Sequence, residues 1–298
     1  MASPGQTLRI GLVQQRCSVD PDDNLARAIA GVERAAREGA GVVCLPELFR
    51  TRYPCQSEDP SRFELAESIP GPSSEALCKC AGELGVAIVG SLFERRAAGL
   101  YHNTATLIDE SGTLRARYRK LHVPDDPLYY EKFYFTPGDL GVPVVSLAGA
   151  PMASLLCWDQ WFPEAARLAA LGGAEVIFFP TAIGWQFDEG EAVDTAQHDA
   201  WETIQRSHAI ANGSFTVAVN RVGDEQLPGA SSGIRFWGQS FVADPAGRVL
   251  ARAPADEEAV LVVDCDLSLV ERTRRDWPFL RDRRVDVYSE LTKRFRDD

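Results

Sequence analysis

The sequence has no long apolar run. None of its apolar stretches approaches the roughly 20 residues that a membrane-spanning helix requires. The first six residues, MASPGQ, contain neither a basic residue nor the apolar core of a secretion signal. We therefore expect a cytoplasmic protein with no membrane partner.

Cysteine and histidine are present, but not in the arrangement of a disulfide framework or a metal site. The seven cysteines are odd in number and scattered along the chain, which suits a reducing compartment. The four histidines stand far apart, and neither H-E-x-x-H nor C-x-x-C occurs. The phosphate-binding patterns G-x-x-x-x-G-K-[ST] and G-x-G-x-x-G are also missing. The sequence thus predicts no metal ion and no cofactor.

Basic residues are scarce relative to acidic ones. The chain has 31 Lys and Arg against 43 Asp and Glu, which gives a net charge of −12 at pH 7. An acidic protein is repelled by nucleic acid and by anionic membranes. We therefore expect a small-molecule partner and no nucleic acid, and the negative charge suits a cationic substrate.

Helical and strand patterns alternate along the chain. Apolar residues recur at helical spacing in residues 22–38, whereas residues 41–45 form a short apolar run typical of a strand covered on both faces. Later segments predict a helix over 194–211 and a strand over 236–243. Buried strands mixed with hairpins favour an α/β fold with two facing sheets and helices outside, in one domain over the whole chain. The charged tail, from about residue 268, is expected to pack at an oligomer interface.

The stretch SLLCWDQWFPEAAR, residues 154–167, begins as an apolar strand and ends as a helix. Pro163 suits the first turn of that helix, and Glu164 is a favourable charge at its positive end. Cys157 lies at the corner between strand and helix, where its sulfur would be exposed and its pKa lowered. Acyl-transfer enzymes place their nucleophile at such a corner. A single cysteine is more often a small buried apolar residue, however, so this interpretation depends on neighbouring groups.

Three other polar residues lie where they could join the cysteine. Glu47 and Lys120 end predicted strands, and Glu131 lies in the long loop that follows Lys120. Each alone could be a solvated surface charge, but strand ends in an α/β sheet open onto the crevice where ligands bind. Together with Cys157 they supply a thiol, a carboxylate base and a cation for attack on an amide carbonyl. The cation and the backbone N–H of Trp158 would face the developing oxyanion.

Four motifs resemble the nitrilase superfamily of carbon–nitrogen hydrolases: PELF at 46–49, YRKLH at 118–122, EKFYFTPGD at 131–139 and CWDQWFPE at 157–164. They occur in the family's order and spacing, over nearly the whole chain. The resemblance implies an α/β fold that is a four-layer α-β-β-α sandwich, commonly dimeric, so we expect a homo-oligomer of two or more subunits. It also implies a catalytic triad of Glu47, Lys120 and Cys157, with Glu131 positioning the lysine and the substrate.

Within that superfamily the sequence looks most like the N-carbamoylputrescine amidases of polyamine synthesis. The similar stretches are EKFYF at 131–135, the run 157–167, PTAIG at 180–184 and FLRDRR at 279–284. The resemblance implies hydrolysis of N-carbamoylputrescine to putrescine, CO2 and ammonia through a thioester on Cys157. Substrate contacts are expected from Tyr53, Trp158, Thr181 and Trp185.

The charge of the substrate should be matched by the loops around the site. A protonated amine needs a carboxylate at the far end of the pocket, and the candidates are Asp125, Asp126, Asp188, Glu189 and Glu191. A ureido acid, one alternative substrate, would need an arginine clamp, and only Arg52 lies near such a loop. An ω-amide is the other alternative. Trp185 stands where those amidases tend to carry a small polar residue, so we expect it to shorten the pocket or to cover an aliphatic chain.

Three rival interpretations differ in the residues they require. The run GASSG at 229–233 matches the serine-hydrolase pattern, but that fold needs a histidine after the serine, and the last histidine is His208. A cysteine–histidine hydrolase remains open, with His122, His198 and His208 as candidates. A catalytically inactive interaction module would be expected to have lost a member of the triad, and none is lost.

Overall fold

The computed structural model describes residues 7–296, apart from the side chains of Glu191 and Asp194. Two six-stranded sheets form its centre. The first sheet consists of β1 (Thr7–Gln14), β2 (Val42–Cys44), β3 (Ala87–Ala97), β4 (Leu100–Ile108), β5 (Leu114–Arg119) and β15 (Ala259–Asp266). Its spatial order is β15-β1-β2-β3-β4-β5, with β1, β2 and β3 parallel and the remaining pairs antiparallel.

The second sheet has the same plan. It consists of β6 (Val145–Leu147), β7 (Ala150–Ser154), β8 (Val176–Thr181), β10 (Phe215–Asn220), β13 (Phe241–Ala243) and β14 (Val249–Arg252). The order is β14-β13-β10-β8-β7-β6, with β7, β8 and β10 parallel. A third, three-stranded sheet is formed by β9 (Gly184–Gln186), β11 (Val222–Gln226) and β12 (Gly233–Trp237).

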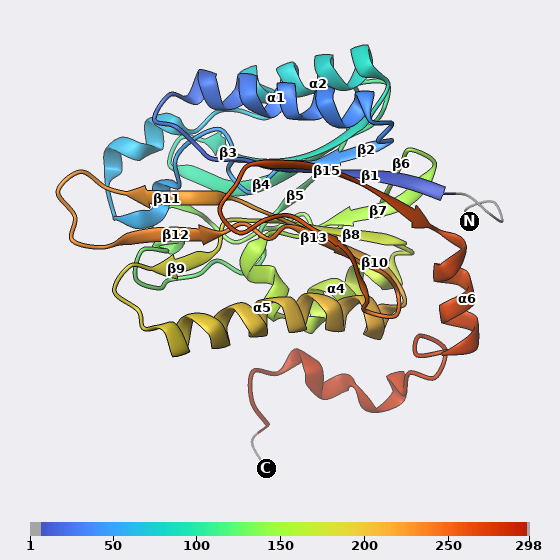
Figure 1. Ribbon diagram of the computed structural model, residues 1–298. Helices are drawn as coiled ribbons and strands as arrows, with labels where there is room; N and C mark the ends of the chain where they lie inside the picture. The colour runs from blue at the N-terminus through green and yellow to red at the C-terminus, as the bar shows by residue number, and fades with distance from the viewer. Residues whose placement is uncertain (1–6, 297–298) are drawn as a thin grey trace.

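Helices cover the outer faces of both six-stranded sheets (Figure 1). The helices of the described chain are α1 (Pro21–Arg37), α2 (Pro72–Leu84), α3 (Glu131–Tyr134), α4 (Pro163–Leu171), α5 (Glu191–Asn212) and α6 (Ser268–Asp276), with short 3₁₀ turns η1 (Pro54–Gln56), η2 (Pro60–Leu65), η3 (Cys157–Trp161), η4 (Val285–Val287) and η5 (Ser289–Thr292). Helices α1 and α2 lie on the first sheet, and α4 and α5 lie on the second. The expected four-layer α-β-β-α arrangement is confirmed. No described helix is long and apolar enough to cross a membrane.

The N-terminal helix shows how local sequence sets an element in place. The Asp20 carboxylate accepts hydrogen bonds from the first backbone N–H groups of α1, and Pro21 occupies the first helical position, where no N–H is required. Val32 and Ala35 are fully buried against the first sheet. At Gly31 a Cβ would lie 2.6 Å from Val13 Cγ1 on β1. The helix can therefore pack this closely on the sheet only because the residue is glycine.

The core between the two sheets is apolar and closed. Side chains from both sheets interlock there, with Leu12 and Val89 from one side and Phe178 and Val217 from the other, all 0–1% exposed. Burying a side chain of this size contributes about 1.5–3 kcal/mol relative to leaving it exposed. This rigid interface fixes the strand ends that carry the functional residues.

One expected strand is interrupted at a turn, and two further strands were not expected. The strand expected over 236–243 is two strands, β12 and β13, which belong to different sheets. The chain breaks at Gly238 and Gln239, whose φ angles are 57° and 50°, and two successive left-handed residues cannot continue a strand. Strands β9 and β11 were not expected, because their short polar runs carry little alternation.

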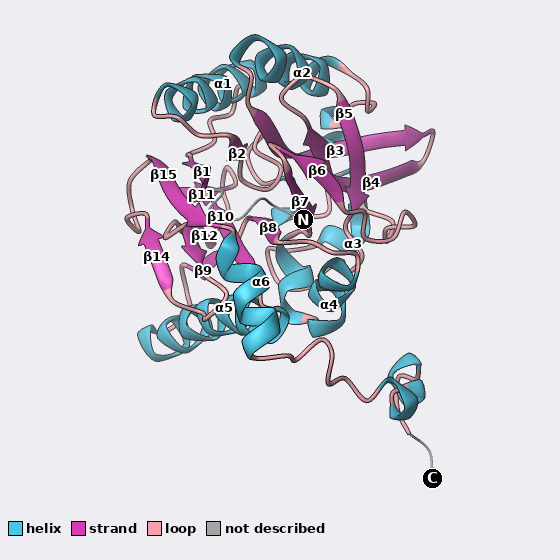
Figure 2. Cartoon of the chain, turned by 90° about the vertical axis from the view of Figure 1, so that its right-hand side faces the viewer, coloured by secondary structure: helices cyan, strands magenta, loops and turns pink. Residues whose placement is uncertain are grey.

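The segment after β15 leaves the layers. Helix α6 is held against the body by Val270, which is buried, and by Arg274, which donates to the carbonyls of Asn212 and Ala174. Figure 2 shows the chain beyond α6 running away from the other elements. We call residues 277–296 the C-terminal arm. Most of its side chains are exposed.

Candidate active site

Cys157 lies on a strained turn just after β7. Its φ angle is 36°, in the left-handed region that non-glycine residues rarely adopt. The Asp159 carboxylate holds the turn, since Oδ2 accepts from the Leu156 N–H at 3.0 Å and from the Tyr118 hydroxyl at 2.6 Å. The sharp corner expected for Cys157 is therefore present. However, the residue opens the 3₁₀ turn η3, and the α-helix begins only at Pro163.

A buried lysine lies at the centre of the site. Lys120 Nζ donates to Glu47 Oε1 at 2.9 Å and to both oxygens of Glu131, at 2.9 and 2.7 Å. Glu47 comes from the loop after β2, Lys120 directly follows β5, and Glu131 opens α3 rather than lying in an irregular loop. All three side chains are buried. Burial alone lowers the pKa of Lys120, but the Glu131 and Glu47 carboxylates raise this pKa well above its usual value.

The Glu47 carboxylate has one oxygen engaged and one free. Its Oε1 atom also accepts from Asn103 Nδ2 at 2.7 Å, and Asn103 in turn accepts from the Ser91 hydroxyl. Its Oε2 atom is buried and has no hydrogen-bond partner among the described residues. A carboxylate oxygen without a hydrogen-bond partner in a buried site is suited to receive a proton. Sequence reasoning missed Asn103, because β4 also carries His102, Thr104 and Thr106 and nothing in the sequence distinguishes the amide from these polar neighbours.

The thiol of Cys157 is held in its protonated form. Burial raises its pKa well above the ordinary value, and Glu47 adds to the rise. Lys120 and the backbone of Ala182 act in the opposite direction but do not prevail. The expectation that a helix start would lower this pKa is wrong, because the α-helix begins farther along the chain and the sulfur is desolvated next to carboxylates.

Tyr53 contacts the cluster from behind. Its hydroxyl donates to Glu131 Oε1 at 2.6 Å. Burial raises the pKa of Glu131, and Lys120 opposes that rise. Tyr53 therefore orients a carboxylate and does not line the cavity described next.

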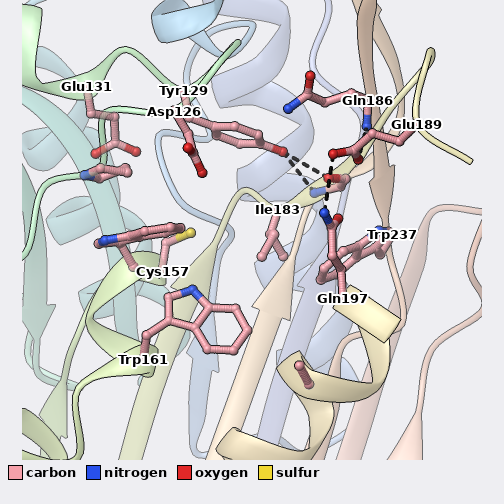
Figure 3. Close-up of a pocket in the computed structure, with 14 residues that line it drawn as sticks. Asp126, Tyr129, Glu131, Cys157, Trp161, Ile183, Gln186, Glu189, Gln197 and Trp237 are labelled. Atoms are coloured by element: carbon pink, nitrogen blue, oxygen red, sulfur yellow. Dashed lines mark hydrogen bonds between the residues drawn. The ribbon is translucent and has the colours of Figure 1, made fainter. Parts of the chain in front are cut away.

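A cavity of about 290 Å³ opens in front of Cys157 (Figure 3). Its lining residues come from η3, α3 and the segment before it, β9 and the loops on either side of it, α5 and β12, and are Pro124, Asp126, Tyr129, Glu131, Cys157, Trp158, Trp161, Ile183, Gly184, Gln186, Glu189, Gln197, Ala200 and Trp237. Four of these residues are aromatic: Tyr129, Trp158, Trp161 and Trp237. Among these described residues there is no lysine or arginine.

The expected substrate contacts are only partly placed at this cavity. Trp158 lines it, whereas Tyr53, Thr181 and Trp185 do not. The Thr181 hydroxyl is buried and donates to the carbonyl of Phe179, and the Trp185 ring packs against Trp237. Strand alternation explains the position of Trp185, because its neighbours on β9, Gly184 and Gln186, line the cavity and successive residues point to opposite faces of a strand.

Two described carboxylates line the cavity besides Glu131. Glu189 is held by Gln197 Nε2 and by the Gln186 N–H, both at 3.2 Å, on the side away from the sulfur, whereas Asp126 lies beside Tyr129 (Figure 3). Asp188 instead accepts from the Ser232 hydroxyl. Asp125 does not line the cavity, and the side chain of Glu191 is outside the described residues.

The histidines are engaged elsewhere. His122 Nδ1 lies 2.8 Å from Asp159 Oδ1, and its ring stacks on Phe162. His208 Nε2 lies 2.7 Å from the carbonyl of Gln160, and His198 packs among tryptophans. None lines the cavity, so the geometry does not favour a cysteine–histidine pair. Within residues 7–296 no group of three or more His, Cys, Asp or Glu side chains could hold a metal ion.

The charge balance at the sulfur leads to a first prediction. Replacing Glu47 by Gln removes a negative charge that raises the pKa of Cys157, so that pKa should fall even though the proton acceptor is lost. The measurement is a pH titration of thiolate absorbance in the ultraviolet, with Cys157→Ser as the blank for the other cysteines. Glu110→Gln, which neutralises an exposed carboxylate, is the matched control. An unchanged or higher pKa in Glu47→Gln would contradict this account of the site.

Comparison with known proteins agrees with this geometry. Residues 9–275 match the carbon-nitrogen hydrolase family. The chain is 41% identical to the N-carbamoylputrescine amidase of Solanum lycopersicum over 98% of its own length and 97% of the relative's. A carbon-nitrogen hydrolase from Helicobacter pylori G27 superposes with a TM-score of 0.94, at 42% identity, covering 98% of this chain and 100% of that one.

An amidase mutant from Nesterenkonia sp. AN1 carries the acetamide moiety of fluoroacetamide covalently on its active-site cysteine. It matches with a TM-score of 0.77 and 29% identity, over 97% of this chain and 98% of that one. The family match spans most of the chain, and the cysteine, lysine and carboxylates converge at one cavity. The chain therefore belongs to the carbon–nitrogen hydrolases of the nitrilase superfamily.

Proposed function

We propose that this enzyme hydrolyses N-carbamoylputrescine to putrescine, CO2 and ammonia through a thioester on Cys157. The observation that carries the proposal is the cavity itself, which has the thiol on one side and the Glu189 carboxylate, beside Gln186 and Gln197, on the other. A linear molecule with a carbamoyl group at one end and an ammonium at the other is complementary to that arrangement. The likeness to an N-carbamoylputrescine amidase supports the same substrate.

The first half of the reaction forms the thioester. Cys157 Sγ attacks the carbamoyl carbon while the free oxygen of Glu47 accepts the thiol proton. The tetrahedral intermediate then loses its terminal nitrogen, which takes the proton from Glu47 and leaves as ammonia. A base is needed because the resting thiol, with its raised pKa, is protonated.

The second half releases the amine. Water attacks the thioester carbon, Glu47 removes a proton from the water, and that proton returns to the sulfur. The product is the carbamic acid of the diamine, which loses CO2. Lys120 and the backbone N–H of Trp158 stabilise the oxyanion in both halves, and Glu131 keeps the lysine charged and in place.

The negative charge of the cavity favours this cationic substrate over the two alternatives, a ureido acid and an ω-amide. A ureido acid would bring a carboxylate toward Glu189, where it would be repelled, and no arginine among the described lining residues could clamp it. Arg52 donates to the carbonyl of Gln226 and does not line the cavity. An uncharged ω-amide would fit sterically but would leave the Glu189 carboxylate without a cationic partner.

The proposal includes a homo-oligomer of at least two subunits, working in the cytoplasm. The C-terminal arm exposes Val285, Leu291 and Phe295, at 67%, 63% and 79%. Apolar side chains of this size gain free energy when a second subunit covers them. All seven cysteines are free thiols, which fits a reducing compartment and can be checked by cell fractionation.

The substrate proposal predicts an order of rates. Ammonia release should be fastest, as kcat/KM, on N-carbamoylputrescine, slower on simple ω-amides and slowest on 3-ureidopropionate. Cys157→Ala should abolish turnover while the protein stays folded. Lys120→Ala should lower kcat by about 100- to 1000-fold, the usual loss when one oxyanion donor is removed. Preference for the anionic ureido acid, or turnover by Cys157→Ala, would refute the proposal.

If Glu189 binds the substrate ammonium, replacing it should weaken the binding of charged substrates and not that of uncharged ones. Glu189→Gln should raise KM for N-carbamoylputrescine by about 5- to 10-fold, because a charge-assisted hydrogen bond is weakened at a partly exposed position. N-butylurea, which lacks the ammonium, should be affected by less than about twofold. Asp188→Asn is the matched control, since this neighbouring carboxylate faces Ser232 instead of the cavity. Equal losses on both substrates would remove Glu189 from substrate recognition.

The oligomer predicts a mass of at least twice 32.7 kDa in light scattering at micromolar concentration. Leu291→Asp should shift the mass toward that of one subunit, because a charge would be buried at the contact. Val19→Asp, at a residue that is 78% exposed in the loop before α1, is the control. A mass near 32.7 kDa for the unmodified protein would contradict the proposal.

A further inference from the structure

A fully buried arginine is hydrogen-bonded to the loop that carries Glu47. Arg221 lies between β10 and β11, and its side chain is 0% exposed. Its Nε atom donates to the carbonyl of Glu47 at 3.0 Å, and its Nη2 atom donates to the carbonyls of Leu48 and Thr51. One planar guanidinium therefore fixes three carbonyls of a single turn.

The turn needs such support. Leu48 has a φ angle of 48°, which is unfavourable for a branched residue and persists only where the surroundings impose it. The Leu48 N–H is held in addition by the Ser91 hydroxyl. The backbone at Glu47 is thus defined by contacts from outside the loop.

Glu225 links Arg221 to Tyr53, at the C-terminal end of the same loop. It accepts from Arg221 Nη1 at 2.9 Å and, through its second oxygen, from the Tyr53 N–H at 2.7 Å. Tyr53 in turn orients Glu131 through its hydroxyl. Both carboxylates that hold Lys120 therefore depend on the Arg221–Glu225 pair, one through its own backbone and one through Tyr53.

We infer that the Arg221–Glu225 pair is a positioning device for the reaction, which sets Glu47 and Glu131 at the distances that the proton transfers and the lysine require. Neither residue lines the cavity, so the pair acts only through the residues it holds. Lysine cannot replace Arg221, because an ammonium lacks the planar fork that reaches separate carbonyls. The inference rests on the proposed chemistry at Cys157 and not on the identity of the substrate.

The test is a double-mutant cycle. Arg221→Lys should lower kcat by about 10- to 100-fold with KM nearly unchanged, since small displacements of catalytic groups cost rate rather than binding. In the Glu47→Gln background the same replacement should lower kcat by a clearly smaller factor, because one of the two carboxylates that the pair positions is already disabled and only the effect through Glu131 remains. Single-turnover ammonia release allows the slow variants to be compared. A residue with a merely structural role would reduce kcat by the same factor in both backgrounds.

Controls separate folding and substrate effects from positioning. Arg235→Lys alters an exposed arginine on β12, paired with Asp224, and should leave kcat unchanged. Should Arg221→Lys fail to fold, Glu225→Gln, which is nearly isosteric, enters the same cycle. Additive losses, or a rise in KM alone, would overturn the inference. If the unmodified enzyme does not act on N-carbamoylputrescine, only the substrate proposal fails, and the cycle is run with the amide that it does hydrolyse.

Discussion

The burial of one ammonium group is the constraint on which the site depends. Taking Lys120 out of water costs several kcal/mol unless opposite charges and hydrogen bonds compensate for it. Glu47 and Glu131 provide both, and they come from separate parts of the chain that meet only in the folded protein. The supporting contacts of Asn103 and Tyr53 follow from the same need, since each carboxylate must itself be held in place.

Burial decides the state of the Cys157 thiol, and the neighbouring carboxylates reinforce its effect. Desolvation raises the pKa of this thiol well above its ordinary value and Glu47 adds to the rise, so the thiol keeps its proton at rest. Attack and proton transfer must then be coupled. This design differs from a cysteine activated by a helix start, in which the thiolate exists before the substrate arrives.

Chemistry and recognition are separated along the cavity. The buried Lys120 cluster lies next to Cys157, whereas Glu189 lies in the loop between β9 and α5, on the other side of the cavity beside Gln197 (Figure 3). Loops can change charge without disturbing the buried cluster, because the cluster is held by strand ends of two packed sheets.

The sequence by itself determined the elements with strong local signals and the residues in recognisable motifs. The capping of α1, the buried strand before Glu47 and the motif residues Lys120, Glu131 and Cys157 are of this kind, because spacing and residue type act locally. Only the tertiary structure decided which side chains face the cavity. Tyr53 and Thr181 turn away from it, and Arg221 reaches a loop about 170 positions distant in the chain. Such placements depend on long-range packing and on where buried polar groups find partners, and neither leaves a periodic mark in the sequence.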